Sequence, residues 1–298
     1  MIKTKKKSNV LNFVPVIILV IFSIILYFSI PVLFDYKDLK SEIEKKFYKE
    51  FKINLKILSK ITQKTLPAPY LLINKSTLNL RDDSQKSTII NLDELKIYTP
   101  ARDIYSKSKL KMKGLEIRNS NFKFKFKDIK NLRNHLYYKV NEPIKIFNSK
   151  FFYLDKNNNT IVISPIHKLE YHINEKNNSK ELKIKGNIFD TEYHSLWRRS
   201  YDNPKESYNE ISFKDPNLTL KNLFKFKNDS NFSGNISINF LNEGIYIDYQ
   251  KNDKKIFITP SPEKINQKIK IISNIELNPF HFNTEIILVE KDFKFIID

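Results

Sequence analysis

The hexapeptide FKFKFK, residues 122–127, shows the pattern that decides how most of this chain folds. Phe122, Phe124 and Phe126 alternate with lysines, so an extended backbone places the rings on one face and the ammonium groups on the other. Strict alternation of apolar and charged residues is typical of a β-strand with one buried and one solvated face. The hexapeptide therefore predicts a strand in an antiparallel sheet.

Segments with the same period of two occur on both sides of this hexapeptide, separated by turn-like clusters of Asn, Asp, Ser and Lys. Clear examples are LLINKSTLNL (71–80), INLDELKIYT (90–99), PIKIFNSKFFYLD (143–155), GNISINFL (234–241) and KIKIISNIEL (268–277). Roughly thirteen such segments predict a mainly β domain over residues 53–298, built as an elongated antiparallel sheet. Two short helices, at 129–140 and 218–226, and an irregular loop from Asp190 to Ser207 are expected to interrupt it.

The apolar face of such a sheet can be used in two ways. In a sealed sandwich it packs against a second layer, whereas an open, curved sheet forms a groove (a β-taco) that can hold lipid tails. Periodicity alone does not distinguish the two arrangements. The residues expected to line an open groove are Phe122, Phe124, Phe126, Ile184, Ile188, Ile236, Ile238 and Phe240.

A membrane anchor is expected near the start of the chain. Residues 10–34, VLNFVPVIILVIFSIILYFSIPVLF, carry no charge and follow the basic opening MIKTKKK. About 20 apolar residues in a helix cross a bilayer, so a transmembrane helix is predicted over residues 9–34. The lysines before it favour a cytoplasmic tip, residues 1–8, with the bulk of the chain across the membrane. A cleaved signal peptide is the alternative, but such signals end in small residues, whereas Val32, Leu33 and Phe34 are bulky.

An amphipathic helix is predicted directly after this span, over residues 35–52. Leu39, Ile43, Phe47 and Phe51 recur every four residues, with charged side chains between them. This spacing places one apolar stripe along a helix. We expect the stripe either to lie on the membrane surface or to close the near end of the β domain.

The composition restricts the classes of function. A net charge of +19 is typical of nucleic-acid-binding proteins. The lysines are spread along the whole chain, however, and the predicted topology separates them from nucleic acid, so no nucleic-acid partner is expected. Coding bias of an AT-rich genome and attraction to anionic phospholipid headgroups are the two explanations that remain. The chain has no cysteine, which excludes disulfides and thiolate metal sites.

Sequence motifs for catalysis are missing. Four isolated glycines cannot form a Gly-rich phosphate loop, and the chain has neither G-x-S-x-G nor H-E-x-x-H. His167 and His172, five residues apart in a predicted strand, point to opposite faces unless a bulge intervenes. We therefore expect no enzymatic activity, no metal site and no cofactor.

One polar segment is a candidate for binding lipid headgroups. Trp197, Arg198 and Arg199 follow one another in the predicted irregular loop. A guanidinium group suits bidentate contacts with phosphate, so Arg198 and Arg199 are candidate headgroup contacts. The alternative is an aromatic ring packed under a loop that carries two solvated arginines.

The order of these features resembles the start of AsmA-family proteins, in which an uncleaved anchor, an amphipathic helix and an L-P-x-P segment lead into a strand. The residues that carry the resemblance are Asp35, Tyr36, Leu39, Lys40, Ile43, Leu66, Pro67, Pro69, Leu72 and Leu78. It is best over residues 2–115, patchy to Asp155 and weak beyond. The resemblance implies an inner-membrane protein of diderm bacteria with a periplasmic β-taco whose apolar groove conducts phospholipid toward the outer membrane.

Two hypotheses for function follow. The first is a non-enzymatic protein that transfers phospholipid during outer-membrane assembly. Thirteen strands about 4.8 Å apart would extend its groove roughly 60 Å, too short to cross a periplasm. We therefore expect either a truncated family member or one that pairs end to end with another envelope protein. The second hypothesis is a membrane-tethered β-domain scaffold that binds another envelope protein.

Overall fold

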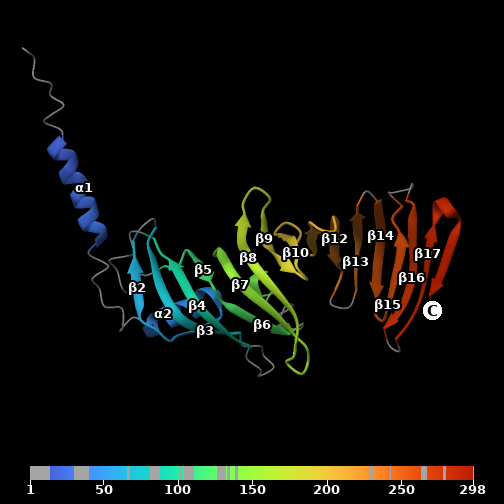
Figure 1. The fold of residues 1–298 in the computed structure, drawn as a ribbon, viewed down its shortest axis with the longest axis horizontal. Coiled ribbons are helices and arrows are strands. Elements are labelled where there is room, and N and C mark those ends of the chain that lie inside the picture. The colour runs from blue at the N-terminus through green and yellow to red at the C-terminus, as the bar shows by residue number, and fades with distance from the viewer. Residues whose placement is uncertain are drawn as a thin grey trace, which may run out of the picture.

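The computed structural model describes residues 14–29, 40–65, 68–80, 88–100, 103, 111–125, 132, 135–137, 140–228, 231–241, 243–262, 267–277 and 280–297. Within these residues, two α-helices precede one sheet of eighteen strands. The predicted mainly β fold is therefore confirmed. Figure 1 shows the strands following one another along the long axis of the molecule, and the C-terminus lies at the far end.

The helices are α1 (Val14–Ser29) and α2 (Lys40–Phe51). The first strands are β1 (Asn54–Ile57), β2 (Ile61–Lys64), β3 (Tyr70–Leu80), β4 (Thr88–Tyr98), β5 (Gly114–Arg118), β6 (Asn121–Lys125), β7 (Ile144–Leu154), β8 (Thr160–Asn174) and β9 (Ser179–Ile188). The later ones are β10 (Thr191–Ser200), β11 (Glu206–Phe213), β12 (Leu218–Phe226), β13 (Phe232–Phe240), β14 (Glu243–Asn252), β15 (Lys255–Pro260), β16 (Ile269–Leu277), β17 (Phe280–Leu288) and β18 (Phe293–Ile297). A short 3-10 helix (Val289–Lys291) precedes β18.

The sheet is mixed rather than wholly antiparallel. β1 and β2 lie end to end along the same side of β3, and β5 and β6 share the space between β4 and β7 in the same way. Both β5 and β6 run parallel to β7, whereas every pairing from β7 to β18 is antiparallel. Parallel neighbours require a long crossover connection, which here comprises residues 126–143.

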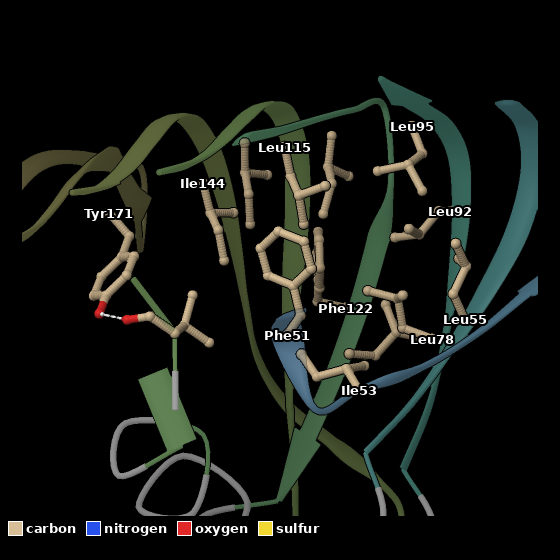
Figure 2. Close-up of a cluster of buried hydrophobic side chains, with 14 of the residues drawn as sticks. Phe51, Ile53, Leu55, Leu78, Leu92, Leu95, Leu115, Phe122, Ile144 and Tyr171 are labelled. Carbon is tan, nitrogen blue, oxygen red and sulfur yellow. Dashed lines mark hydrogen bonds between the residues drawn. The ribbon is translucent and has the colours of Figure 1, made fainter. Parts of the chain in front are cut away.

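The crossover and α2 together cover the first part of the sheet. Leu136 and Val140 from the crossover are buried in the same core cluster as Ile43, Phe47 and Phe51 from α2. Figure 2 shows part of this cluster, in which Phe51 and Ile53 lie among strand residues such as Leu78, Leu115 and Phe122. The apolar stripe of the predicted amphipathic helix therefore closes the near end of the β domain. Leu39, its first member, lies outside the described residues.

Two local predictions were wrong. Residues 218–226 form β12 rather than a helix, and most of the expected loop from Asp190 to Ser207 belongs to β10. β12 pairs along its whole length with both β11 and β13, so its backbone groups are satisfied without a helix. β10 is paired with β9 at every position, which orders a stretch of weak intrinsic strand character.

The predicted anchor is described in part. α1 comprises 16 residues, and its side chains from Val16 to Leu26 include none that is buried. Among the residues that the structure describes, no helix is both long and apolar enough to cross a bilayer. Residues 9–13 and 30–34 of the predicted span, and residues 35–39 of the predicted amphipathic helix, lie outside the described part. The span therefore stays a prediction.

Opposite the core, the first part of the sheet carries a buried carboxylate, Glu116. Its oxygens accept hydrogen bonds from Arg118 Nε at 2.7 Å, Lys96 Nζ at 3.0 Å and the Tyr98 hydroxyl at 2.9 Å. Burial is the largest single influence on the pKa of Glu116 and raises it, but these three donors together outweigh burial. The pKa of Glu116 is therefore lowered from its ordinary value.

Replacing Glu116 with glutamine is expected to lower the free energy of unfolding at pH 7 by roughly 1–3 kcal/mol, because the half-buried donors Lys96 and Arg118 lose a charged acceptor. A carboxylate with a lowered folded-state pKa stabilises the fold above its unfolded value of 4.5, and this contribution is lost as the pH falls through the folded value. The difference in the free energy of unfolding between wild type and Glu116→Gln, measured by urea denaturation, should therefore become smaller as the pH is lowered. The more exposed ion pair of Glu285 and Lys294 supplies a control. Glu285→Gln should change the free energy of unfolding by less than about 0.5 kcal/mol at every pH measured. A constant difference down to pH 3 would contradict the charged network.

Candidate functional site

From β9 to β18 the sheet has one apolar face and one polar face. Side chains alternate along each strand, and directly paired residues share a face. One line of paired residues crosses six strands as Ile184, Ser195, Ile211, Leu220, Ile238 and Ile245. We call this side the apolar face. It consists of the even-numbered residues of β9, β12, β13, β15 and β17 and the odd-numbered residues of β10, β11, β14, β16 and β18.

Charged residues are almost confined to the opposite, polar face. Within the described strands β9 to β18, the charged residues on the apolar face are Lys180, Arg199, Lys251 and Glu243. The polar face of the same strands carries Glu181, Lys183, Lys185, Glu192, Arg198, Glu206, Glu210, Lys221, Lys225, Asp248, Lys255, Lys270, Glu276, Glu285 and Lys294. The distribution is that of a one-sided amphipathic ribbon.

Cover over the apolar face decreases along the sheet. On β10, Tyr193 and Trp197 are buried, each 6% exposed. Further along, Ile236 and Ile238 are half-buried, and on β18 Phe293 and Phe295 are about half exposed. Figure 1 shows β12 to β17 as a single layer of strands, with no helix over them within the described residues. Within the described residues, the apolar face is therefore covered over the first strands, which we call the closed part, and less covered over the later strands, which we call the open part.

An apolar cavity of about 320 Å³ lies under the crossover in the covered part of the sheet, and its lining extends as far as β10 and β11. Its walls include Phe122 and Phe124 of β6, Ile184 of β9, Trp197 of β10 and Leu136 of the crossover. Cavities of about 150 Å³ already bind small apolar molecules, and ligand pockets begin at about 300 Å³. The cavity is thus large enough for a segment of an acyl chain.

The structure brings most of the predicted groove residues onto one side of the sheet. Phe122, Phe124 and Ile184 line the cavity, and Ile188 is partly buried against the core cluster. Ile236, Ile238 and Phe240 occupy the apolar face of β13, and Phe240 is exposed. Phe122 and Phe124 are 4% and 3% exposed, so these two belong to the closed part. Phe126 lies outside the described residues.

The two candidate headgroup arginines lie on opposite faces of β10. Arg198 is on the polar face, where its Nε donates to Glu181 Oε1 at 2.9 Å. Burial, the largest influence, raises the pKa of Glu181, but donors including Lys183 and Asn174 and the charge of Arg198 outweigh it and lower that pKa. Arg199 is on the apolar face, with its guanidinium carbon 4.0 Å from the centre of the Tyr137 ring. Of the pair, Arg199 is the one placed to meet a ligand on the apolar face.

Two residues that the sequence analysis missed fasten the crossover over the cavity. Tyr171 donates its hydroxyl hydrogen bond to the carbonyls of Leu136 and Val140, at 2.7 and 2.8 Å. Lys180 donates to the carbonyls of Tyr137 and Val140 and to Asn141 Oδ1. Burial raises the pKa of Tyr171 and lowers the pKa of Lys180. No sequence signal marks either residue, because their partners lie more than thirty positions earlier in the chain.

The histidines do not form a metal site. A bulge between Ile166 and Lys168 interrupts β8, and His167 contacts Asn187 Oδ1 at 2.8 Å while His172 lies 3.8 Å from Glu181. Within the described residues, no group of three His, Cys, Asp or Glu side chains could hold a metal ion.

No family model matches this chain. A search of curated proteins also finds no match. The AsmA resemblance therefore rests on the residues already quoted, and the functional argument rests on the sheet and its apolar face.

Proposed function

We propose that this chain is a membrane-anchored, non-enzymatic protein of the AsmA type that binds phospholipid acyl chains along the apolar face and transfers phospholipid in outer-membrane assembly. The observation that carries the proposal is the segregation of side chains in β9 to β18. A soluble single-layer sheet would be expected to expose polar residues on both faces, whereas here one face is apolar across ten consecutive strands.

The proposed location is a bacterial inner membrane, with residues 9–34 as a single span, residues 1–8 in the cytoplasm and the sheet in the periplasm. Support comes from the large apolar side chains of α1 between Val16 and Leu26, which are exposed in the structure. The basic residues before α1 support the orientation. This topology also places Lys3, Lys5, Lys6 and Lys7 beside the anionic headgroups of the cytoplasmic leaflet, where each nearby Lys or Arg contributes about 1 kcal/mol.

Lipid extraction tests this function directly. The full chain, purified in a mild detergent, is expected to retain phospholipid that mass spectrometry detects at roughly stoichiometric or higher amounts. A membrane protein of similar size without such a face, purified in parallel, gives the background of annular lipid. Recovery at that background would count against acyl-chain binding and would leave the scaffold as the remaining hypothesis.

A protein partner at the far end of the sheet is proposed from β18. Within the described residues β18 pairs with β17 alone, and its residues Phe293, Phe295, Ile296 and Ile297 are 46–58% exposed. Exposed apolar edge strands pair readily with a strand from another chain. We infer that another envelope protein adds a strand here and extends the apolar face. Because the chain has no cysteine, Phe295→Cys introduces a unique position for crosslinking. Glu285→Cys, a separate variant with its cysteine on the polar face of β17, is the control. A crosslinked adduct with Phe295→Cys but not with Glu285→Cys would support edge pairing.

A further inference from the structure

Four aromatic rings gather along one margin of the apolar face on β12 to β14. The Phe224 ring centre lies 4.4 Å from that of Phe226, 4.8 Å from Phe232 and 6.3 Å from Tyr249. Gly234 makes room for them, since a Cβ atom at this position would lie 2.8 Å from Cζ of Tyr249. We call Phe224, Phe226, Phe232 and Tyr249 the aromatic shelf.

A cation lies at each end of the aromatic shelf. The Arg199 guanidinium carbon is 5.4 Å from the centre of the Phe226 ring, and Lys251 Nζ is 5.6 Å from the centre of Phe232. Lys251 is also paired directly with Phe232 in the sheet register. Both side chains are half-buried, so they combine an apolar contact with access to solvent.

Charge on the apolar face is therefore asymmetric. Arg199 and Lys251 lie along the margin of the aromatic shelf, and Lys180 is the residue of β9 paired with Arg199. The acid of this face within the described strands, Glu243, lies at the opposite end of β14 from Lys251. Between Lys251 and Glu243 the apolar face of β14 presents Tyr249, Ile247 and Ile245, a span of about 27 Å at 3.4 Å per residue. One leaflet of a bilayer has a hydrocarbon depth of about 15 Å, so an acyl chain fits within this span.

From this asymmetry we propose that phospholipids on the apolar face lie with their phosphates along the margin of Arg199 and Lys251 and their acyl chains across the isoleucines of β13 and β14. The inference rests on the proposed acyl-chain binding and adds the orientation and the need for an anionic phosphate. Aromatic rings suit the boundary between headgroup and acyl chain, because one side of the ring is apolar while its edge tolerates water. Four strand spacings separate β10 from β14, about 19 Å, so the two cations meet different lipid molecules.

Binding measurements on the full chain in mild detergent test the orientation with three probes: phosphatidylglycerol, diacylglycerol with the same acyl chains, and glycerol 3-phosphate. Wild type is expected to prefer phosphatidylglycerol over diacylglycerol. Lys251→Gln and Arg199→Gln should each reduce this preference about fivefold, equal to about 1 kcal/mol per cation. The double variant should reduce the preference about fivefold at both positions and no further, because the two cations contact different lipid molecules. Lys221→Gln, on the polar face of β12, should leave the preference unchanged.

Each alternative outcome has a definite meaning. If wild type binds neither lipid, the proposed function itself is wrong. If it binds both lipids and the preference does not change in either variant, acyl-chain binding stands and the headgroup margin is refuted. Competition by glycerol 3-phosphate at concentrations similar to those of the lipid would also refute it, because a site for a free phosphate ester would then be present. Thermal melting checks the fold of each variant, and Lys251→Gln alone decides the question if Arg199→Gln melts early.

Discussion

Replacing Phe47 with alanine is expected to lower the free energy of unfolding by roughly 3–5 kcal/mol, the largest stability effect that we anticipate. Phe47 is fully buried, and its ring centre lies 4.8 Å from that of Phe51. Both rings belong to the core cluster that α2 shares with the first strands. Removing the ring leaves a cavity in the part of the sheet that is closed, where the surrounding strands cannot collapse to fill it. Urea denaturation of the full chain in detergent measures the change.

The neighbouring residue supplies a matched control. Tyr48 is 50% exposed, so Tyr48→Ala removes a similar ring from the other side of α2. Its effect should stay within about 0.5 kcal/mol. Equal losses for the two variants would contradict a core role for the stripe of Ile43, Phe47 and Phe51, and would favour a helix that lies on the membrane surface instead.

Local periodicity was sufficient to predict most of the fold. The alternation at Phe122 and Phe124 and the four-residue spacing of Phe47 and Phe51 each describe how one element buries one face, and the structure has a strand and a helix at these positions. The strand is parallel to β7, however, whereas an antiparallel sheet was predicted. The predictions failed where pairing with neighbouring strands selects the secondary structure. LTLKNLFKF, residues 218–226, has apolar residues at spacings compatible with helix or strand, and pairing with β11 and β13 selects the strand.

The candidate site was less predictable, because it depends on register and cover. Adjacent arginines Arg198 and Arg199 are equivalent in sequence, yet the strand places one beside Glu181 and the other over Tyr137. Nothing in the sequence singles out Lys251, and its position beside the aromatic shelf follows from its pairing with Phe232. The parallel pairing of β6 with β7, which brings the crossover over Phe122 and Phe124, cannot be predicted from alternation, since alternation is the same in parallel and antiparallel strands.

Replacing Ile238 with glutamate is expected to reduce the phospholipid recovered with the protein at least tenfold while the fold is retained. Ile238 is half-buried on the open part of the apolar face, between Leu220 of β12 and Ile245 of β14. A carboxylate there stays hydrated in the lipid-free protein, so its cost to folding is modest. An acyl chain laid over it would have to desolvate the charge, which is costly without a partner. Mass spectrometry of bound lipid and a thermal melt of the same sample measure the two effects together.

Two further substitutions turn this result into a test of where the sheet is open. Ser237→Glu places the same charge one residue away on the polar face and should leave both lipid and fold unchanged. Phe124→Glu buries a charge in the closed part, where the native ring is 3% exposed, and should unfold the domain. If Ile238→Glu also unfolds the domain, a second layer covers the later strands and acyl chains have no access to them. If Ile238→Glu folds and keeps its lipid, the bound acyl chains do not lie over Ile238, because a carboxylate in the path of an acyl chain cannot be neutral to its binding.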